Sequence, residues 1–233
     1  MTLALTGKTA VVTGTAHGIG AAIAEALRGD GAAVHGIDKD TADLTDAAAV
    51  REIFTGLGGV DILVNNAGGV CEQVGRPLEE VTDHDWHAVV HANLTTAFLC
   101  TRAVVPAMKE RRWGRIINIS SVAGLGVSKT GIQAYASAKA AQIGFTRQMA
   151  YELGPFGITV NCIAPGFIRS NPTTERQWQS YGTEGQGDLV RGIAMRRLGE
   201  PADIAYGVRF FAAERSSWIT GQTISIDGGS AFI

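Results

Sequence analysis

Short apolar runs alternate along the chain with longer segments in which apolar residues recur at helical spacing. The short runs predict strands because each is bounded by turn residues. We expect these strands at residues 9–13, 33–37, 61–65, 115–120, 159–163 and 222–226. The helical pattern predicts helices at residues 18–28, 83–108 and 135–153, with a bend in the second near Asn93. The repeated strand–helix–strand order favours a doubly wound parallel sheet, a Rossmann-like α/β fold, in one domain over residues 1–233.

The interval after the second expected strand breaks this rhythm. That strand ends near Asp38, and the run from Asp43 to Asp46 already opens the next unit. A parallel crossover normally needs about a dozen residues, usually as a helix, and the four residues between Asp38 and Asp43 cannot form one. We therefore predict that the helix between the second and third strands is missing or vestigial. The strand around residues 41–44 would then be very short, and the sheet would be trimmed at this edge.

Composition narrows the class of protein. With 20 basic and 22 acidic residues, the formal net charge is −2. The chain therefore lacks the basic excess that would indicate binding to nucleic acid or to an anionic membrane. The start of the chain lacks a secretory hydrophobic segment, and we expect no apolar run long enough to span a membrane. Cys71, Cys100 and Cys162 fit neither a disulfide framework nor a zinc site, and we interpret them as small buried apolar residues. These features predict a cytoplasmic protein.

Three glycines follow the first expected strand, where the first expected helix begins. Gly14, Gly18 and Gly20 have the spacing Gly-x-x-x-Gly-x-Gly, with His17 and Ile19 among them. Such glycines let the backbone approach a pyrophosphate, which the helix N-terminus attracts. The motif alone is weak, because a structural tight turn gives the same pattern and the spacing differs from the commoner dinucleotide fingerprint.

Asp38 ends the second expected strand, about 20 residues after the glycines, where an acidic residue accepts hydrogen bonds from the ribose hydroxyls of NAD. Its charge would repel the 2′-phosphate of NADP, and the glycine turn contains His17 rather than Arg or Lys. We therefore expect NAD as the cofactor. Lys39 is the neighbouring feature that favours NADP, and a solvated turn residue is the alternative interpretation of Asp38.

An ordered set of further motifs follows the glycine turn. These are Asn65-Asn66-Ala67-Gly68, Asn93, Ser121, Tyr135-x-x-x-Lys139, Pro165-Gly166 and Asp227-Gly228-Gly229. Together with the turn, they make the chain resemble the short-chain dehydrogenase/reductases, in their ordinary non-extended form, over essentially its whole length. The resemblance implies oxidoreductase activity on CH–OH groups and a homotetramer. It also assigns catalytic roles to Asn93, Ser121, Tyr135 and Lys139.

Tyr135 and Lys139 also have a physical rationale. Four residues apart on a helix, they share one face. A phenol has a pKa of about 10, which is too high for a base at neutral pH, but a nearby ammonium and an oxidised nicotinamide both favour the phenolate. Tyr135 could then take a hydroxyl proton in oxidation or return it in reduction. An exposed Tyr–Lys pair is the alternative, which the preceding cofactor motif disfavours.

Ser121 competes with Ser120 for the third catalytic role, at the end of a strand whose carboxyl edge binds ligands in this architecture. Side chains alternate along a strand, so only one of the two can face the site. The family pattern, Ser followed by two small apolar residues and Gly, selects Ser121, which would hydrogen-bond the substrate oxygen. The step of 14 residues from Ser121 to Tyr135 is one longer than usual in the family, which leaves the shape of this loop open.

The remaining contacts are implied by the resemblance. Asp43 and Leu44 would flank the adenine, residues 66–68 the adenosine ribose, and the Ile168 backbone the nicotinamide carboxamide, while Lys139 would reach the nicotinamide ribose. Asn93 would hold a water that links Lys139 to solvent; a helix-bend residue is its alternative role. The full expected cofactor set is Gly14, His17, Gly18, Ile19, Asp38, Asp43, Leu44, Asn66, Ala67, Gly68, Tyr135, Lys139, Pro165, Gly166, Ile168 and Ser170, the last of these standing where the family often has Thr.

Two further segments bear on ligands. His84, His87 and His91 could share one helix face, but three histidines from one straight helix cannot easily surround a zinc ion, so we expect no metal. By resemblance, the polar and poorly periodic residues 171–197 form a mobile substrate lid. Arg169, Arg176 and Trp178 lie in or near it and could grip an anionic or sugar-like substrate, or could be surface residues.

The function that these features favour is NAD-dependent interconversion of a small secondary alcohol and its ketone. NAD preference indicates oxidation of a polyol, sugar or hydroxy acid. The main alternative is a 3-oxoacyl-thioester reductase. A non-catalytic nucleotide-binding scaffold on the same fold is a third possibility, which the complete catalytic set disfavours.

Overall fold

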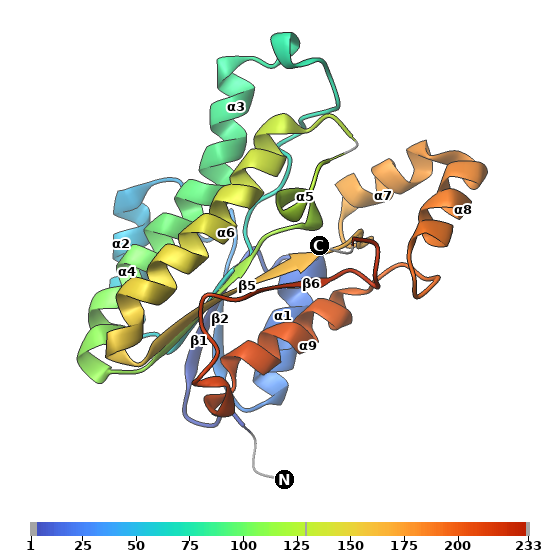
Figure 1. The fold of residues 1–233 in the computed structure, drawn as a ribbon. Helices are drawn as coiled ribbons and strands as arrows, with labels where there is room; N and C mark the ends of the chain where they lie inside the picture. Colours follow the sequence, from blue (N-terminus) through green and yellow to red (C-terminus); the bar gives the residue numbers. More distant parts are fainter. Residues whose placement is uncertain (1–3, 129, 232–233) are drawn as a thin grey trace.

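Six parallel strands form one sheet through the middle of the protein (Figure 1). The structure is a computed structural model that describes residues 4–128 and 130–231. The strands are β1 (Thr9–Thr13), β2 (Ala33–Ile37), β3 (Ile62–Asn65), β4 (Gly114–Ile119), β5 (Ile158–Pro165) and β6 (Thr223–Ile226). Their order in the sheet is β2-β1-β3-β4-β5-β6. The six expected strands and the doubly wound parallel sheet are thus confirmed.

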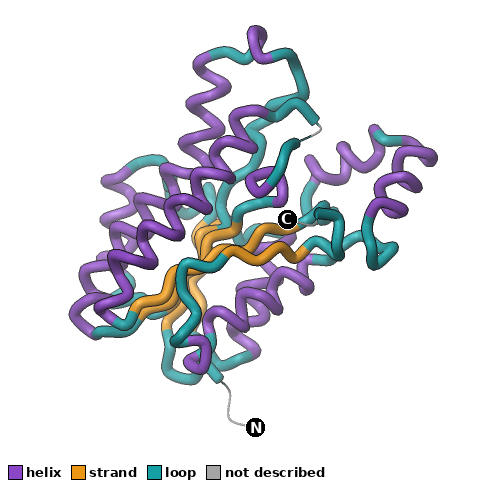
Figure 2. Tube along the Cα trace, viewed as in Figure 1, coloured by secondary structure: helices purple, strands orange, loops and turns teal. Residues whose placement is uncertain are grey.

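Helices cover both faces of the sheet, and each face encloses its own apolar core (Figure 2). On one face, α1 (Gly18–Gly29) packs against α9 (Pro201–Ala212). On the other face lie α2 (Ala47–Gly56), α4 (Thr96–Arg111) and α6 (Gln133–Leu153). Strands β1, β3, β4 and β5 are buried along nearly their whole length, because helices cover parallel strands from both sides.

The trimmed edge of the sheet is formed by β2. The residues from Lys39 to Thr45 form no helix, as predicted for the interval after Asp38. A helix does lie between β2 and β3, however, so the prediction that it would be missing or vestigial is wrong. The expected short strand at residues 41–44 is wrong. These residues turn instead, with Thr41 N and Ala42 N donating to the Asp38 carbonyl, so they extend no ladder. The crossover from β2 to β3 is therefore made by α2, which the sequence interpretation did not identify.

The bend expected near Asn93 is confirmed as a π-helical turn. It covers His91–Thr95, between α3 (Asp83–Val90) and α4. By length and composition alone, the helical run Asp83–Arg111 could cross a membrane, but a helix of a protein core passes the same test. The apolar composition of α4 has a local cause, since this helix packs on β3, β4 and α2 within the second core.

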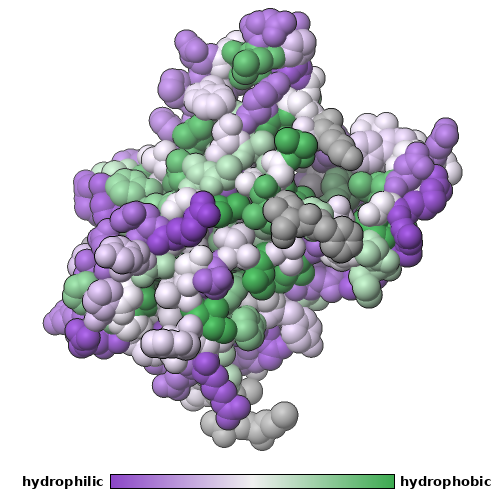
Figure 3. Space-filling view, in the orientation of Figure 1, coloured by the Kyte–Doolittle hydropathy of each residue, from purple (hydrophilic) through white to green (hydrophobic). Residues whose placement is uncertain are grey.

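Two helices occupy the segment expected to be a poorly periodic lid. α7 (Pro172–Ser180) and α8 (Gly182–Gly192) form a pair that projects from the body of the protein (Figure 1). Asn171 begins α7 with a capping box that it shares with Thr174, which explains how a polar sequence starts a helix. Hydrophilic residues gather on the outer edge of this pair (Figure 3).

We expect Leu27→Ala to lower the free energy of unfolding by about 2–5 kcal/mol, because Leu27 of α1 is fully buried and its loss leaves a cavity. Urea denaturation would measure the change. Glu25→Ala on the exposed side of the same helix is the matched control and should change the free energy by less than about 0.5 kcal/mol. Equal effects of the two substitutions would contradict the packing described for α1.

Candidate active site

Ser121, Tyr135 and Lys139 meet at the carboxyl ends of β4 and β5. Ser121 lies two residues after the end of β4 and caps α5 (Val122–Leu125), with its Oγ accepting a hydrogen bond from Ala123 N at 3.2 Å. Tyr135 and Lys139 lie one turn apart on α6, and Lys139 Nζ is 5.6 Å from the centroid of the Tyr135 ring. The Ser121 side chain lies close enough to the Tyr135 hydroxyl to lower the pKa of that phenol. The structure thus brings three of the four expected catalytic side chains into one cluster.

The Ser120 side chain points away from Tyr135 and already has a hydrogen-bond partner. Its buried Oγ donates to the Lys139 carbonyl at 2.7 Å, which ties β4 to α6. The Ser120 hydroxyl is therefore engaged with the Lys139 backbone, and Ser121 is the serine that faces Tyr135. Residues 126–132 complete the longer step to Tyr135 without separating it from Ser121; within them, Lys129 lies outside the described residues.

The Lys139 ammonium is buried, with 3% of the residue exposed. Burial lowers its pKa to about 8, an effect that the neighbouring Cys162 partly opposes. Two oxygens compensate the charge, since Nζ donates to the Ile119 carbonyl at 2.8 Å and to Gln142 Oε1 at 3.0 Å. Below about pH 8, the site therefore holds a positive charge beside Tyr135.

The Tyr135 hydroxyl is tuned by opposing effects. Burial raises its pKa above the ordinary value, and the hydrogen bond with Ser121 lowers it. With burial dominant, Tyr135 is a neutral phenol near pH 7 and can donate a proton. To act as a base, it needs further positive charge, such as an oxidised nicotinamide would bring.

Asn93, the fourth expected catalytic residue, is fully buried in the π turn. Its side chain holds the loop after β3, with Nδ2 donating to the Gly69 carbonyl at 2.8 Å and Oδ1 accepting from Gly69 N at 3.1 Å. Gly68 is required here because a Cβ would lie 2.4 Å from Asn93 Oδ1. Asn93 is thus both a helix-bend residue and the anchor of the Gly68–Gly69 segment.

Between Asn93 and Lys139 lies a residue that the sequence interpretation missed. The Gln142 side chain donates to the Asn93 carbonyl at 3.1 Å while accepting from Lys139. The Gln142 amide thus links the Asn93 carbonyl to the Lys139 ammonium. A polar residue on the buried face of a helix, three positions after Lys139, was the signal that could have identified it.

The backbone of the glycine turn is fixed by its φ angles and by hydrogen bonds from Asn66. Gly14 and Gly18 have positive φ angles of 72° and 60°, which favour glycine. Asn66 Nδ2 donates to the carbonyls of Thr13 and Gly14 at 2.9 and 3.0 Å. The exposed His17 precedes α1 without capping it, so the first N–H groups of this helix are available to an anion.

The polar residues expected around a dinucleotide lie along this turn. Asp38 accepts a hydrogen bond from Ala16 N at 2.8 Å, so its carboxylate sits against the glycine turn. Ser170 lies on the other side, close enough that a Cβ at Gly18 would approach the Ser170 carbonyl oxygen to 2.2 Å. The structure therefore brings Asp38, the turn and Ser170 together.

The other expected cofactor residues occupy varied environments. Leu44 is buried in the second core. Asp43 accepts hydrogen bonds from the Thr45 hydroxyl and backbone N–H, which lower the pKa of its carboxyl group. Ile168, which follows β5, is buried and forms an isolated parallel β-bridge with Gly199.

Arg169 is not a free cation. Its guanidinium forms a bidentate ion pair with Glu175 at 2.9 and 3.0 Å and stacks over Trp178 at 5.3 Å. Arg176 donates to the Thr173 hydroxyl. Because Glu175 neutralises Arg169, these contacts do not present an open anion-binding site.

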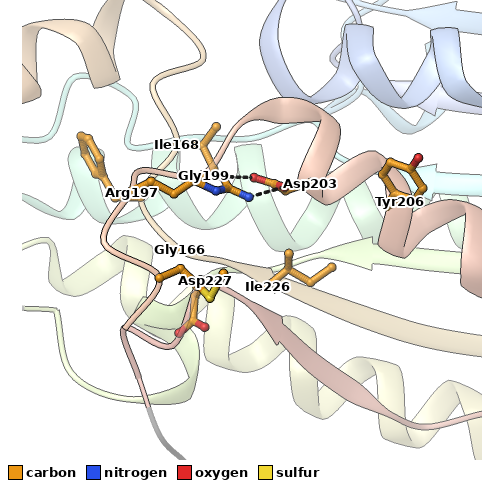
Figure 4. A pocket seen from close by; sticks show the side chains of 11 residues that line it. Gly166, Ile168, Arg197, Gly199, Asp203, Tyr206, Ile226 and Asp227 are labelled. Carbon is orange, nitrogen blue, oxygen red and sulfur yellow. Dashed lines mark hydrogen bonds and ion pairs between the residues drawn. The ribbon is translucent and has the colours of Figure 1, made fainter. Parts of the chain in front are cut away.

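A cavity of about 290 Å³ lies behind the Gly166 loop, between β5, β6 and α9 (Figure 4). Arg197 in its wall is ion-paired with Asp203 at 2.7 and 2.9 Å. Ser121, Tyr135 and Lys139 do not line it. The cavity is therefore separate from the catalytic cluster.

Two cysteines behave as expected and one does not. Cys100 and Cys162 are buried, whereas Cys71 is exposed in the loop after β3, where it has a positive φ angle of 46°. The histidines at positions 84, 87 and 91 are all exposed. Within residues 4–128 and 130–231, no group of His, Cys, Asp or Glu side chains has a metal-binding arrangement.

Comparisons with known proteins agree with this geometry. A family model described as "Enoyl-(Acyl carrier protein) reductase" matches residues 41–231. The chain is 38% identical to nodulation protein G of Rhizobium sp. (strain N33), over 98% of this chain and 99% of that protein.

Two solved structures share the fold at a TM-score of 0.89. A 3-oxoacyl-[acyl-carrier protein] reductase with bound NAD from Brucella melitensis is 33% identical, over 99% of this chain and 93% of that chain. A candidate gluconate dehydrogenase from Agrobacterium tumefaciens is 29% identical, over 99% and 98%.

We expect Gly124→Ala to destabilise the protein by about 1–3 kcal/mol, because its Cβ would lie 2.6 Å from the Lys139 carbonyl carbon and push α5 away from α6. Urea unfolding would measure this loss. Gly144→Ala, also on α6, meets nothing within 4 Å and should stabilise the helix by up to about 1 kcal/mol. A stabilising effect at both positions would contradict the close approach of α5 and α6.

Proposed function

Because the chain belongs to the short-chain dehydrogenase/reductase family, we propose that this oxidoreductase interconverts a small secondary alcohol and its ketone, with Tyr135 as the general acid and base. The observation that carries the proposal is the convergence of Ser121, Tyr135 and the buried Lys139 ammonium. A non-catalytic scaffold would have no need to bury a charge beside a phenol, because burial is costly.

The glycine turn fits a dinucleotide. Gly14 and Gly18 keep the backbone free of side chains, and the start of α1 offers unpaired N–H groups to a pyrophosphate. Gly14, Gly18, Asp38, Asn66 and Ser170 would hold the group, with the other expected contacts around them. A nicotinamide dinucleotide bound there supplies the hydride acceptor in oxidation and the hydride donor in reduction.

The side chains of the catalytic cluster would carry out the proton transfer. In oxidation, Tyr135 takes the proton of the substrate hydroxyl while the neighbouring carbon loses its hydride; in reduction, Tyr135 returns that proton to the oxygen. Ser121 would donate a hydrogen bond to the substrate oxygen as charge develops on it. The Lys139 ammonium would stabilise the phenolate form of Tyr135 and reach the nicotinamide ribose.

We propose NAD as the preferred cofactor. Asp38 places a carboxylate against the glycine turn, where it would accept the ribose hydroxyls and repel a 2′-phosphate. Its backbone contacts with Ala16 and Lys39 fix this carboxylate in place. The relative from Brucella melitensis binds NAD, which supports the same preference.

The substrate that we propose is a polyol, sugar or hydroxy acid. Gln73 is 94% buried, and among the described residues neither of its side-chain amide atoms has a hydrogen-bond partner. Gln133, which begins α6 two residues before Tyr135, donates to the Arg76 carbonyl and holds the Gln73 loop nearby. Unpaired buried amides favour a ligand with hydroxyl or carboxylate groups. The similarity to a candidate gluconate dehydrogenase agrees with this class.

The second candidate is reduction of a 3-oxoacyl thioester. The family model and the Brucella melitensis relative both carry acyl-carrier-protein reductase descriptions. The neutralised Arg169 argues against a strong anion site on α7 for an acidic carrier protein. A panel of sugars, polyols, hydroxy acids and 3-oxoacyl thioesters would separate the two candidates.

We propose a cytoplasmic homotetramer that acts on a small-molecule substrate, without nucleic acid or membrane partners. Aromatic side chains are exposed on helices outside the site, where subunits could pack. They include Phe98 on α4, Tyr151 on α6, Tyr206 and Phe210 on α9, and Trp218 before β6.

Tyr135→Phe should lower turnover by at least about a thousandfold, because the proton-transfer group is lost, while NADH binding stays within about threefold. Turnover would be followed by NADH absorbance over the substrate panel, and binding by NADH fluorescence. Unchanged turnover would overturn the mechanism.

Asp38→Asn should shift the ratio of kcat/KM for NADPH over NADH upward by about tenfold or more, because the charge that repels the 2′-phosphate is removed. Asn keeps an oxygen that can accept from Ala16 N, so the glycine turn should hold its shape. If the unmodified enzyme already prefers NADPH, the role given to Asp38 is wrong.

A further inference from the structure

Gln142 is a fully buried amide beside the catalytic cluster, and both ends of its side chain are engaged. Its Oε1 accepts from Lys139 Nζ at 3.0 Å, and its Nε2 donates to the Asn93 carbonyl at 3.1 Å. We propose that Gln142 is a positioning residue of the proton-transfer machinery, which orients the Lys139 ammonium and fixes it to the π turn at Asn93. This inference rests on the proposed role of Lys139 in catalysis.

The hydrogen bonds of the ammonium define what Gln142 contributes. An ammonium has three N–H donors. Ile119 and Gln142 accept two of them, which leaves one for the Tyr135 hydroxyl or a cofactor ribose. Without Gln142, the ammonium could rotate between partners, and its charge would lose one of two compensating oxygens inside the protein.

The amide nitrogen of Gln142 is bonded to Asn93, a residue that is itself held by several hydrogen bonds. Asn93 is pinned through its side chain to Gly69 and to the Val89 carbonyl. The Gln142 carbonyl also accepts from the Thr146 hydroxyl, which accepts from Asn118 Nδ2 on β4 at 2.8 Å. Lys139 is therefore fixed through Gln142 to the loop after β3, and α6 is fixed to β4.

Gln142 also occupies the direct route from Lys139 to the Asn93 carbonyl. A side-chain amide passes on a hydrogen bond but does not exchange its protons at neutral pH as water does. Proton exchange between Lys139 and solvent would then go through the Tyr135 side of the site, where substrate binds. This arrangement links proton release to an open substrate site.

Few titratable groups face Lys139. On its own helix there is Tyr135, and on β5 there is Cys162, whose pKa burial raises to about 11, so this thiol stays neutral. The Lys139 charge near neutral pH therefore depends mainly on burial and on its two acceptor oxygens. Removing one of these should lower the pKa of Lys139 below its value of about 8.

The test compares Gln142→Met with Gln148→Met, an exposed position on the same helix. Lysine labelled with carbon-13 lets the Lys139 side chain be titrated by NMR, with its resonance assigned by its loss in Lys139→Met. We expect the Lys139 midpoint to move to lower pH by about one unit in Gln142→Met and to stay in place in Gln148→Met. At pH 7–8, kcat should fall about tenfold, and its pH profile should move.

A Lys139 midpoint and a pH profile that overlay those of the unmodified enzyme would overturn the proposal, even if stability changes. If Gln142→Met does not fold, Gln142→Asn replaces it, because the shorter amide cannot reach both Lys139 and the Asn93 carbonyl. The Lys139 midpoint and the pH profile of kcat are then measured on this variant. An enzyme without turnover on the whole panel, but with a displaced midpoint, would reject the proposed function while showing that Gln142 still sets the environment of the Lys139 ammonium.

Discussion

Burial of one ammonium group organises the active-site side of this protein. A charge inside a protein costs several kcal/mol unless polar groups compensate it, and Lys139 is almost fully enclosed. Its compensation comes from two different elements, the end of β4 at Ile119 and the next turn of α6 at Gln142. Because Ser120 also bonds to the Lys139 carbonyl, α6 cannot slide along the sheet without breaking several of these contacts. The position of Tyr135 against Ser121 follows from that restraint.

The same restraint explains where glycine is indispensable. At Gly124, α5 approaches the Lys139 backbone, and at Gly68 the loop after β3 approaches Asn93; a Cβ at either place would overlap atoms of the polar cluster. The cluster is therefore surrounded by backbone packed at close range. Such packing excludes solvent and strengthens the electrostatic contacts of the buried charge.

The sequence predicted the parallel sheet, the bend at Asn93 and the absence of a helix directly after Asp38, since each depends on local pattern or on chain length. It did not predict α2 or the lid helices α7 and α8. Glycine and polar residues weaken the periodicity of α8, and the capping box that begins α7 depends on side-chain geometry. Within the site, spacing identified Tyr135 and Lys139, and strand alternation limited the choice between Ser120 and Ser121. The role of Gln142 depends on the approach of the π turn to α6, a tertiary contact that no local pattern contains.

The trimmed edge has a consequence for how molecules of this protein meet. An edge strand offers unpaired backbone groups to any other extended chain and can seed aggregation. Here β2 has only five residues, and the Arg28 guanidinium donates to its Val34 carbonyl at 3.4 Å. A short strand with a cation beside it is a poor template for another strand. The edge at β2 is thus protected from self-association by its short length and by charge rather than by a covering element.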